Sequence, residues 1–202
     1  MTQVKRFAAL WIMVLVGLFA ANGASAQQAA LGELVLGKPD APVTMIEYAS
    51  MTCPHCARFH GDTFKALKKK YIDTGKVRFI YREFPFDRLA LAGSIVARCA
   101  GEKRAFGLLD MLFAQQATWA GSQDPIGALA SIARLAGLDR AKIDACLADK
   151  AIADVVLQNR LTGQQEFKVD STPSFVIDGT LYSGALPIEK FDEILAKHLP
   201  QG

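Results

Sequence analysis

Two cysteines separated by two residues mark a junction between two kinds of sequence. The segment VTMIEYA, residues 43–49, is largely apolar, which is typical of a strand covered on both faces. After Cys56, large apolar side chains recur at helical spacing until the Thr-Gly pair at 74 and 75. The sequence therefore predicts a strand, a short turn and a helix, with Cys53 and Cys56 at the start of the helix.

This position gives the two cysteines different chemistry. Free backbone N–H groups and the positive end of the helix dipole favour a thiolate at Cys53. Cys56, one turn further in, is shielded and would be the resolving thiol. Pro54 needs no hydrogen bond in the first helical turn, and His55 can add a positive partner or a donor. A lowered pKa makes Cys53 a better leaving group, so its disulfide would be a stronger oxidant.

Two other interpretations of the pair stay open on the residues alone. Cys53, Cys56 and His60 have the spacing C-x2-C-x3-H, which could form part of a zinc site. Zinc needs a fourth ligand, and the remaining histidines, His55 and His198, are weak candidates. Alternatively, the two thiols could simply pack in the core. A redox pair is favoured, and neither a metal nor another cofactor is expected.

Two further features of the sequence could belong to the same site. Glu47 interrupts an apolar strand six residues before Cys53, so it lies either at an exposed edge or buried beneath the pair. A buried carboxylate there could exchange protons with Cys56. Thr172 and Pro173 directly precede another strand, where proline cannot join a ladder and a cis bond is a common device. The Thr172 backbone could then pair with an extended substrate.

The N-terminus has the pattern of an export signal. Lys5 and Arg6 precede an uncharged apolar run of 15 residues, and Ala-Ser-Ala follows at 24–26. The run is shorter than the roughly 20 residues that span a bilayer, so a cleaved signal peptide at 1–26 is favoured over an uncleaved anchor. Without Lys5 and Arg6 the net charge falls from +3 to about +1, with no basic cluster that predicts nucleic-acid binding.

The remaining chain alternates between strand and helix patterns. A strand, a helix and a strand precede residue 87, and they imply a parallel crossover. Four or five helical segments follow, with Asp124 and Asp139 as N-cap candidates. A hairpin around Asp178 and Gly179 and a final amphipathic helix complete the chain. We expect an α/β core, residues 27–86 and 168–202, with a helical insertion at 87–167.

Together these motifs match the pattern of a known protein family. With Cys-Pro-His-Cys at 53–56, the acid at 47, Thr-Pro at 172 and 173, and a helical block between two halves of a core, it resembles the DsbA family of bacterial thiol-disulfide oxidoreductases. The resemblance implies a thioredoxin fold with a helical insertion. By the same resemblance, Cys53 is the nucleophile, Cys56 the resolving cysteine, Glu47 the buried acid and Pro173 the cis-proline.

The resemblance also carries expectations about function. It implies a periplasmic protein that oxidises newly exported proteins with reduced cysteines and is reoxidised by a quinone-linked membrane oxidase. Many members have valine before the cis-proline, and the Thr172 hydroxyl could instead bond the active-site sulfur and change the oxidising power. A disulfide isomerase, a reductase or a peptide-binding chaperone are the alternatives. We expect a monomer.

A second pair of cysteines lies in the helical segment. Cys99 and Cys146 each fall on an apolar helix face. An exported protein meets an oxidising compartment, so we expect a structural disulfide between them, with two buried thiols as the alternative.

Overall fold

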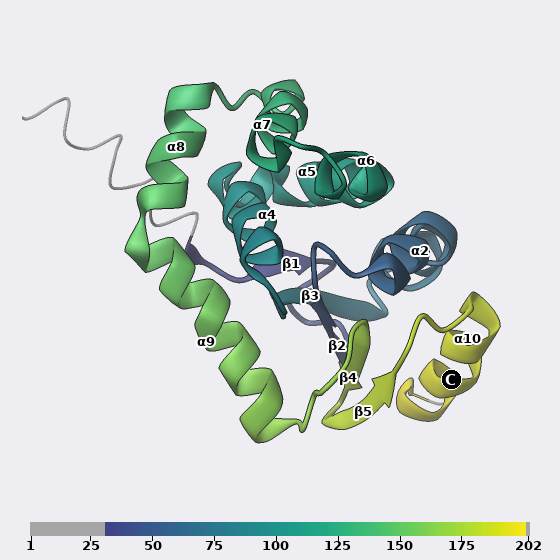
Figure 1. Ribbon diagram of the computed structural model, residues 1–202. Helices are drawn as coiled ribbons and strands as arrows, with labels where there is room; N and C mark the ends of the chain where they lie inside the picture. Colours follow the sequence, from purple (N-terminus) through teal and green to yellow (C-terminus); the bar gives the residue numbers. More distant parts are fainter. Residues whose placement is uncertain (1–30, 201–202) are drawn as a thin grey trace, which may run out of the picture.

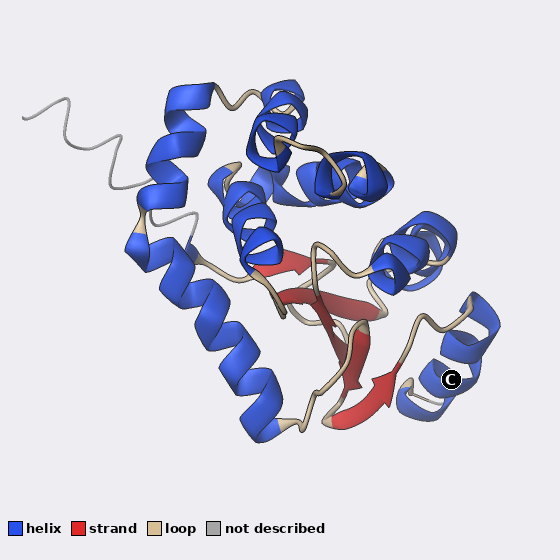
Figure 2. Cartoon of the chain, viewed as in Figure 1, coloured by secondary structure: helices blue, strands red, loops and turns tan. Residues whose placement is uncertain are grey.

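The computed structural model describes residues 31–200 and contains one mixed five-stranded sheet in the order β1-β3-β2-β4-β5 (Figure 2). The strands are β1 (Leu34–Leu36), β2 (Val43–Ala49), β3 (Val77–Glu83), β4 (Ser174–Ile177) and β5 (Thr180–Ser183). The predicted signal peptide, residues 1–26, lies outside the described residues. Within residues 31–200, no helix is both long enough and apolar enough to cross a membrane.

The central strand β2 is the one that leads to the cysteine pair. It runs parallel to β3, with Val43 opposite Val77 and Ala49 opposite Glu83, and antiparallel to β4 on its other side. Both faces of β2 are covered, which explains its apolar sequence. The predicted parallel crossover is therefore confirmed, and the C-terminal end of β2 points the chain into the turn that carries Cys53.

The crossover between β2 and β3 is helical, as predicted, but it is divided into three pieces. It consists of α2 (Pro54–Asp62), α3 (Phe64–Leu67) and the π-helical turn η1 (Lys68–Ile72). Thr63 separates the first two, and its hydroxyl donates a hydrogen bond to the carbonyl oxygen of Leu186. The cysteine pair thus lies on a short helix whose far end is attached to the C-terminal part of the fold.

Between β3 and β4 the described chain contains six helices, rather than the four or five predicted. They are α4 (Arg88–Cys99), α5 (Glu102–Ala114), α6 (Gln116–Ala120), α7 (Pro125–Leu135), α8 (Arg140–Ala148) and α9 (Lys150–Glu166). Asp124 and Asp139 are N-caps, as predicted. The count differs because Asp149 caps α9 immediately after α8, and because the chain bends at Gln115 between α5 and α6.

The last part of the chain returns to the sheet. Asp178 and Gly179 both have positive φ, 44° and 84°, and they form the two-residue connection between β4 and β5. This is the predicted hairpin, since positive φ at both central positions suits an Asp-Gly turn. Helix α10 (Ile188–His198) follows and buries Phe191 against Phe175 of β4.

The two faces of the sheet carry different layers. On one face, α2 and the helices of the insertion cover the main core, which includes Met45, Phe79 and Phe175. On the other face, Tyr48 and Ile80 belong to a smaller cluster that is closed by the end of α9 and the segment after it. In Figure 1, α4 to α8 gather above the sheet while α9 runs down beside it. The fold is a thioredoxin fold with a helical insertion.

Candidate active site

Cys53 and Cys56 lie at the start of α2, as the sequence predicts. Cys53 is the N-cap, Pro54 occupies the first turn, and the backbone N–H of Cys56 donates to the Cys53 carbonyl oxygen at 3.1 Å. Both are free thiols. Cys53 is partly exposed, whereas Cys56 is fully buried. The pair is therefore asymmetric, with one thiol that an external molecule can reach and one that it cannot.

The surroundings shift the two thiol pKa values in opposite directions. A hydrogen bond from Cys56 is the largest influence on Cys53 and lowers its pKa to about 5, against the opposing effect of partial burial. The Thr172 side chain and the backbone N–H groups of Cys56 and His55 lower it further. Burial, the Cys53 thiol and the charge of Glu47 raise the pKa of Cys56 well above its ordinary value. Cys53 is therefore the thiolate at neutral pH.

The loop before β4 lies against Cys53. Cys53 Sγ lies 3.2 Å from the Thr172 carbonyl oxygen, to which the thiol donates a hydrogen bond when it is protonated, and the peptide bond between Thr172 and Pro173 is cis, as predicted. The Thr172 hydroxyl is buried and makes no hydrogen bond of normal geometry to any described residue, although the side chain still lowers the Cys53 pKa. The Thr172 side chain therefore acts on the Cys53 sulfur in the expected direction, without a hydrogen bond of normal geometry from its hydroxyl.

His55 supplies a backbone donor to Cys53, while its ring bonds another residue. Its Nδ1 accepts a hydrogen bond from Arg58 at 2.7 Å, on the exposed side of α2. The backbone N–H of His55 lowers the pKa of Cys53. The imidazole faces Arg58 because the two side chains are three residues apart on one helix and thus neighbours on its surface.

Glu47 is completely buried, so the edge-strand alternative is wrong. Its two carboxylate oxygens lie 3.2 Å and 3.1 Å from Nε2 of His60, which is also buried. The sequence had suggested His60 only as a zinc ligand. Its spacing of four residues from Cys56 places both on one helix face, and this was the signal that could have linked it to the site.

The helical insertion also reaches the cysteine loop, which the sequence did not predict. Gln116 in α6 donates from Nε2 to the carbonyl oxygens of Met51 and Cys53, each at 2.9 Å. Asp87, the N-cap of α4, accepts a hydrogen bond from the Thr52 hydroxyl at 2.7 Å. Two residues of the insertion, Asp87 and Gln116, therefore fix the loop that presents Cys53.

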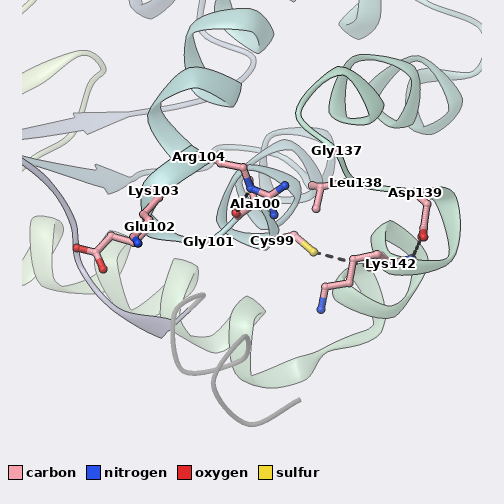
Figure 3. A pocket seen from close by; sticks show the side chains of 10 residues that line it. All are labelled: Cys99, Ala100, Gly101, Glu102, Lys103, Arg104, Gly137, Leu138, Asp139 and Lys142. Carbon is pink, nitrogen blue, oxygen red and sulfur yellow. Dashed lines mark hydrogen bonds between the residues drawn. The ribbon is translucent and has the colours of Figure 1, made fainter. Parts of the chain in front are cut away.

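Cys99 and Cys146 form the predicted disulfide, with their Cα atoms 6.1 Å apart. The bridge joins α4 to α8 inside the insertion. A surface pocket of about 580 Å³ lies beside it, and Figure 3 shows Cys99 at this pocket facing the helix that carries Lys142. The lining residues are Cys99, Ala100, Gly101, Glu102, Lys103, Arg104, Gly137, Leu138, Asp139 and Lys142.

The geometry gives no support to a metal centre in the described part of the chain. Residues 31–200 contain no group of three or more histidine, cysteine or acidic side chains placed to hold a metal ion. His60, which the sequence had offered as a zinc ligand, instead bonds the Glu47 carboxylate.

A comparison with protein families decides where the chain belongs. The model of a family described as thioredoxin matches residues 29–197. The chain belongs to the thioredoxin family. Within this family it is DsbA-like: its structure superimposes on the crystal structure of Wolbachia pipientis alpha-DsbA1 with a TM-score of 0.77 and 29% identity, covering 83% of this chain and 90% of that one.

Two further similar proteins have names that refer to protein disulfides. A crystal structure named protein-disulfide isomerase, from Novosphingobium aromaticivorans, gives a TM-score of 0.71 at 28% identity and covers 82% of this chain and 97% of that one. A putative protein-disulfide oxidoreductase of Rickettsia bellii is 37% identical over 148 residues, 73% of this chain and 57% of the relative. The chain thus spans little more than half the length of this relative.

Proposed function

We propose that this chain is a periplasmic thiol:disulfide oxidoreductase that donates a Cys53–Cys56 disulfide to exported proteins during oxidative folding. The asymmetry of the pair carries the proposal. A partly exposed thiol with a pKa lowered to about 5 is a good leaving group, so the reduced form is stabilised and the disulfide is a strong oxidant. The names of the DsbA-like relatives support the same chemistry.

The proposed reaction has two exchange steps. A substrate thiolate attacks Cys53 Sγ in the oxidised pair, the Cys53–Cys56 bond breaks, and Cys56 leaves and takes up a proton. A second substrate thiolate then attacks the substrate sulfur of the mixed disulfide, and Cys53 leaves as a thiolate. The substrate loses two electrons and the pair gains them. A quinone-linked membrane oxidase would restore the disulfide, and no bound cofactor is required.

The residues around the pair have distinct proposed roles. Thr172 and Pro173 form the surface beside Cys53 on which an extended substrate segment would lie, since the Thr172 carbonyl is already in contact with the sulfur. Pro54 and His55 shape the helix start, and Glu47 exchanges protons with Cys56. The Cys99–Cys146 bridge stabilises the insertion, residues 87–167, between core segments 27–86 and 168–202. We propose that the protein is monomeric and exported by a signal peptide at 1–26.

The first test is the redox equilibrium of the pair against glutathione, measured on residues 27–202. A potential near about −120 mV is expected for an oxidase, whereas one near about −270 mV would mean a reductase. In addition, Cys53→Ser should abolish oxidation of a dithiol peptide. Residual oxidation through Cys56 alone would contradict the assignment of the nucleophile. Peptide binding without any oxidation by the unaltered protein would instead favour a chaperone.

Isomerase activity is the second candidate. The Novosphingobium neighbour carries that name, and by the family resemblance Thr172 occupies the position where many members have valine. Refolding of a scrambled multi-disulfide protein would separate the two. An oxidase alone leaves the scrambled pairings in place, whereas an isomerase restores the native ones.

A further inference from the structure

His60 connects a buried carboxylate to the protein surface. Its Nε2 lies 3.1 Å from Glu47 Oε2, and its Nδ1 lies 3.7 Å from Asp110 Oδ1 on α5. Nδ1 is buried and has no hydrogen-bond partner among the described residues. It borders a pocket of about 310 Å³, which is large enough for water. The pocket is lined by His60, Gly61, Lys65, Asp110, Met111 and Ala114.

Aromatic side chains hold the ring in this orientation. Phe113 stacks on His60 with a centroid distance of 4.2 Å and an angle of 20° between the planes, and Phe64 packs at 4.8 Å. Phe59 approaches with its ring perpendicular at 5.4 Å. These aromatic rings cover the faces of the imidazole, and its two nitrogens face polar groups. Nε2 faces the buried Glu47, and Nδ1 faces Asp110 near the surface. A proton that enters or leaves Glu47 by way of His60 therefore passes through the two ring nitrogens.

Charged and titratable groups from five elements lie around the ring or interact with its partner Glu47. They are Glu47 of β2, Cys56 of α2, Lys65 of α3, Tyr81 of β3 and Asp110 of α5. Burial alone lowers the pKa of His60, but the charge of Glu47 and the proximity of Asp110 outweigh it and raise the pKa to about 9. The imidazole is therefore protonated at neutral pH. Cys56 is a still stronger base, because burial and the nearby Glu47 charge raise its pKa.

Resting on the proposed oxidoreductase function, we propose that His60 relays the proton of Cys56 between Glu47 and the pocket at Asp110. When Cys56 leaves the disulfide as a thiolate, the proton it takes up comes from His60 Nε2 by way of the Glu47 carboxylate. Glu47 is thus a carboxylate again after the transfer, and His60 regains its proton from water in the pocket. The route runs in reverse when the pair is oxidised again. His60 acts through Glu47 and touches no substrate, so it is a positioning residue.

The reaction of the reduced enzyme with 5,5′-dithiobis(2-nitrobenzoate) separates the two thiols. Cys53 attacks first and releases one coloured thiol. Cys56 must then lose its proton to attack the mixed disulfide and release the second. We expect His60→Gln to slow the second release on the order of tenfold at neutral pH and to move its pH profile. The first release, which needs only Cys53, should change less than about twofold.

Two further variants make the test decisive. Asp110→Asn leaves the buried pair intact and alters only a side chain that is 55% exposed, and it should also slow the second release. His198→Gln removes a histidine 3.2 Å from Asp178, in a pair at the surface, and should leave both releases unchanged. If His60→Gln does not fold, the second-release rate of Asp110→Asn alone tests the relay.

Unchanged second-release rates and pH profiles in the folded variants would overturn the relay. Equal slowing of both releases would also overturn it, since this is the signature of a general packing defect. Oxidation of a dithiol peptide by the unaltered protein is measured in parallel. Its absence would contradict the proposed function, whereas its presence with unchanged variants would contradict only the role of His60.

Discussion

Gln116 donates two hydrogen bonds to the backbone on either side of Thr52, at the carbonyl oxygens of Met51 and Cys53. The glutamine is buried and comes from the helical insertion, 63 residues after Cys53 in the chain. The insertion thus holds the loop that presents the reactive thiol. Replacing this one side chain should therefore change the reactivity of Cys53.

We expect Gln116→Leu to reduce the free energy of unfolding by about 1–3 kcal/mol, because two buried carbonyl oxygens lose their donor. The reaction of Cys53 with an alkylating reagent should change as well, since its loop loses an anchor. Urea unfolding and alkylation kinetics measure the two effects. Gln115→Leu is the matched control, because Gln115 is exposed and its side chain makes no bond to the loop. Equal effects of both substitutions would contradict the anchoring role.

The Cys53 thiol should titrate near pH 5 in the reduced protein. The ultraviolet absorbance of the thiolate, or the pH dependence of alkylation, gives the midpoint, and Cys53→Ser should abolish the transition. A midpoint near the ordinary value of about 8.5 would contradict the hydrogen-bonding pattern around the sulfur.

The same shift makes the stability of the reduced form depend on pH. The folded pKa is depressed, so the stabilisation is fully present above the unfolded pKa and is lost as pH falls through about 5. We therefore expect the melting temperature of the reduced form, relative to the oxidised form, to rise from pH 5 to pH 8. The oxidised form has no thiol at Cys53 and is the internal reference. A flat difference over this range would contradict the prediction.

A buried ion pair joins the insertion to the sheet. Arg98 Nε lies 2.6 Å from Glu83 Oε1 and Arg98 Nη2 lies 3.0 Å from Glu83 Oε2, and both side chains are about 1% exposed. Glu83→Gln removes the carboxylate charge that pairs with the Arg98 guanidinium in the interior and should cost about 3–5 kcal/mol of unfolding free energy. Glu33→Gln is the control, because Glu33 pairs with arginines at the surface and should cost at most about 1 kcal/mol. Denaturant unfolding measures the loss of unfolding free energy in each of the two variants.

The Cys99–Cys146 bridge closes a long loop, with a sequence separation of 47. Replacing both cysteines by alanine should reduce the free energy of unfolding by about 4 kcal/mol, because the unfolded chain regains the entropy of loop closure. Thermal and urea unfolding under oxidising conditions measure the change. Unaltered stability would mean that the bridge contributes nothing to the fold.

Local patterns determined the elements around the cysteine pair. The apolar run before Cys53, the helical spacing after Cys56 and the Asp-Gly turn at 178 and 179 each act over a few residues, so their structures could be predicted. The division of the insertion was harder. The break at Asp149 depends on one cap between two helical runs that both favour helix, and the sequence pattern alone did not separate them.

The sequence by itself determined the chemistry: a Cys-x-x-Cys pair at a helix start, an acid in the preceding strand and a proline before β4. Only the tertiary structure decided which groups surround that chemistry. Glu47 is paired with His60, and the Cys53 loop is held by Gln116, because folding brings together residues far apart in the chain. Burial and charge at such contacts depend on three-dimensional packing, which no local pattern specifies.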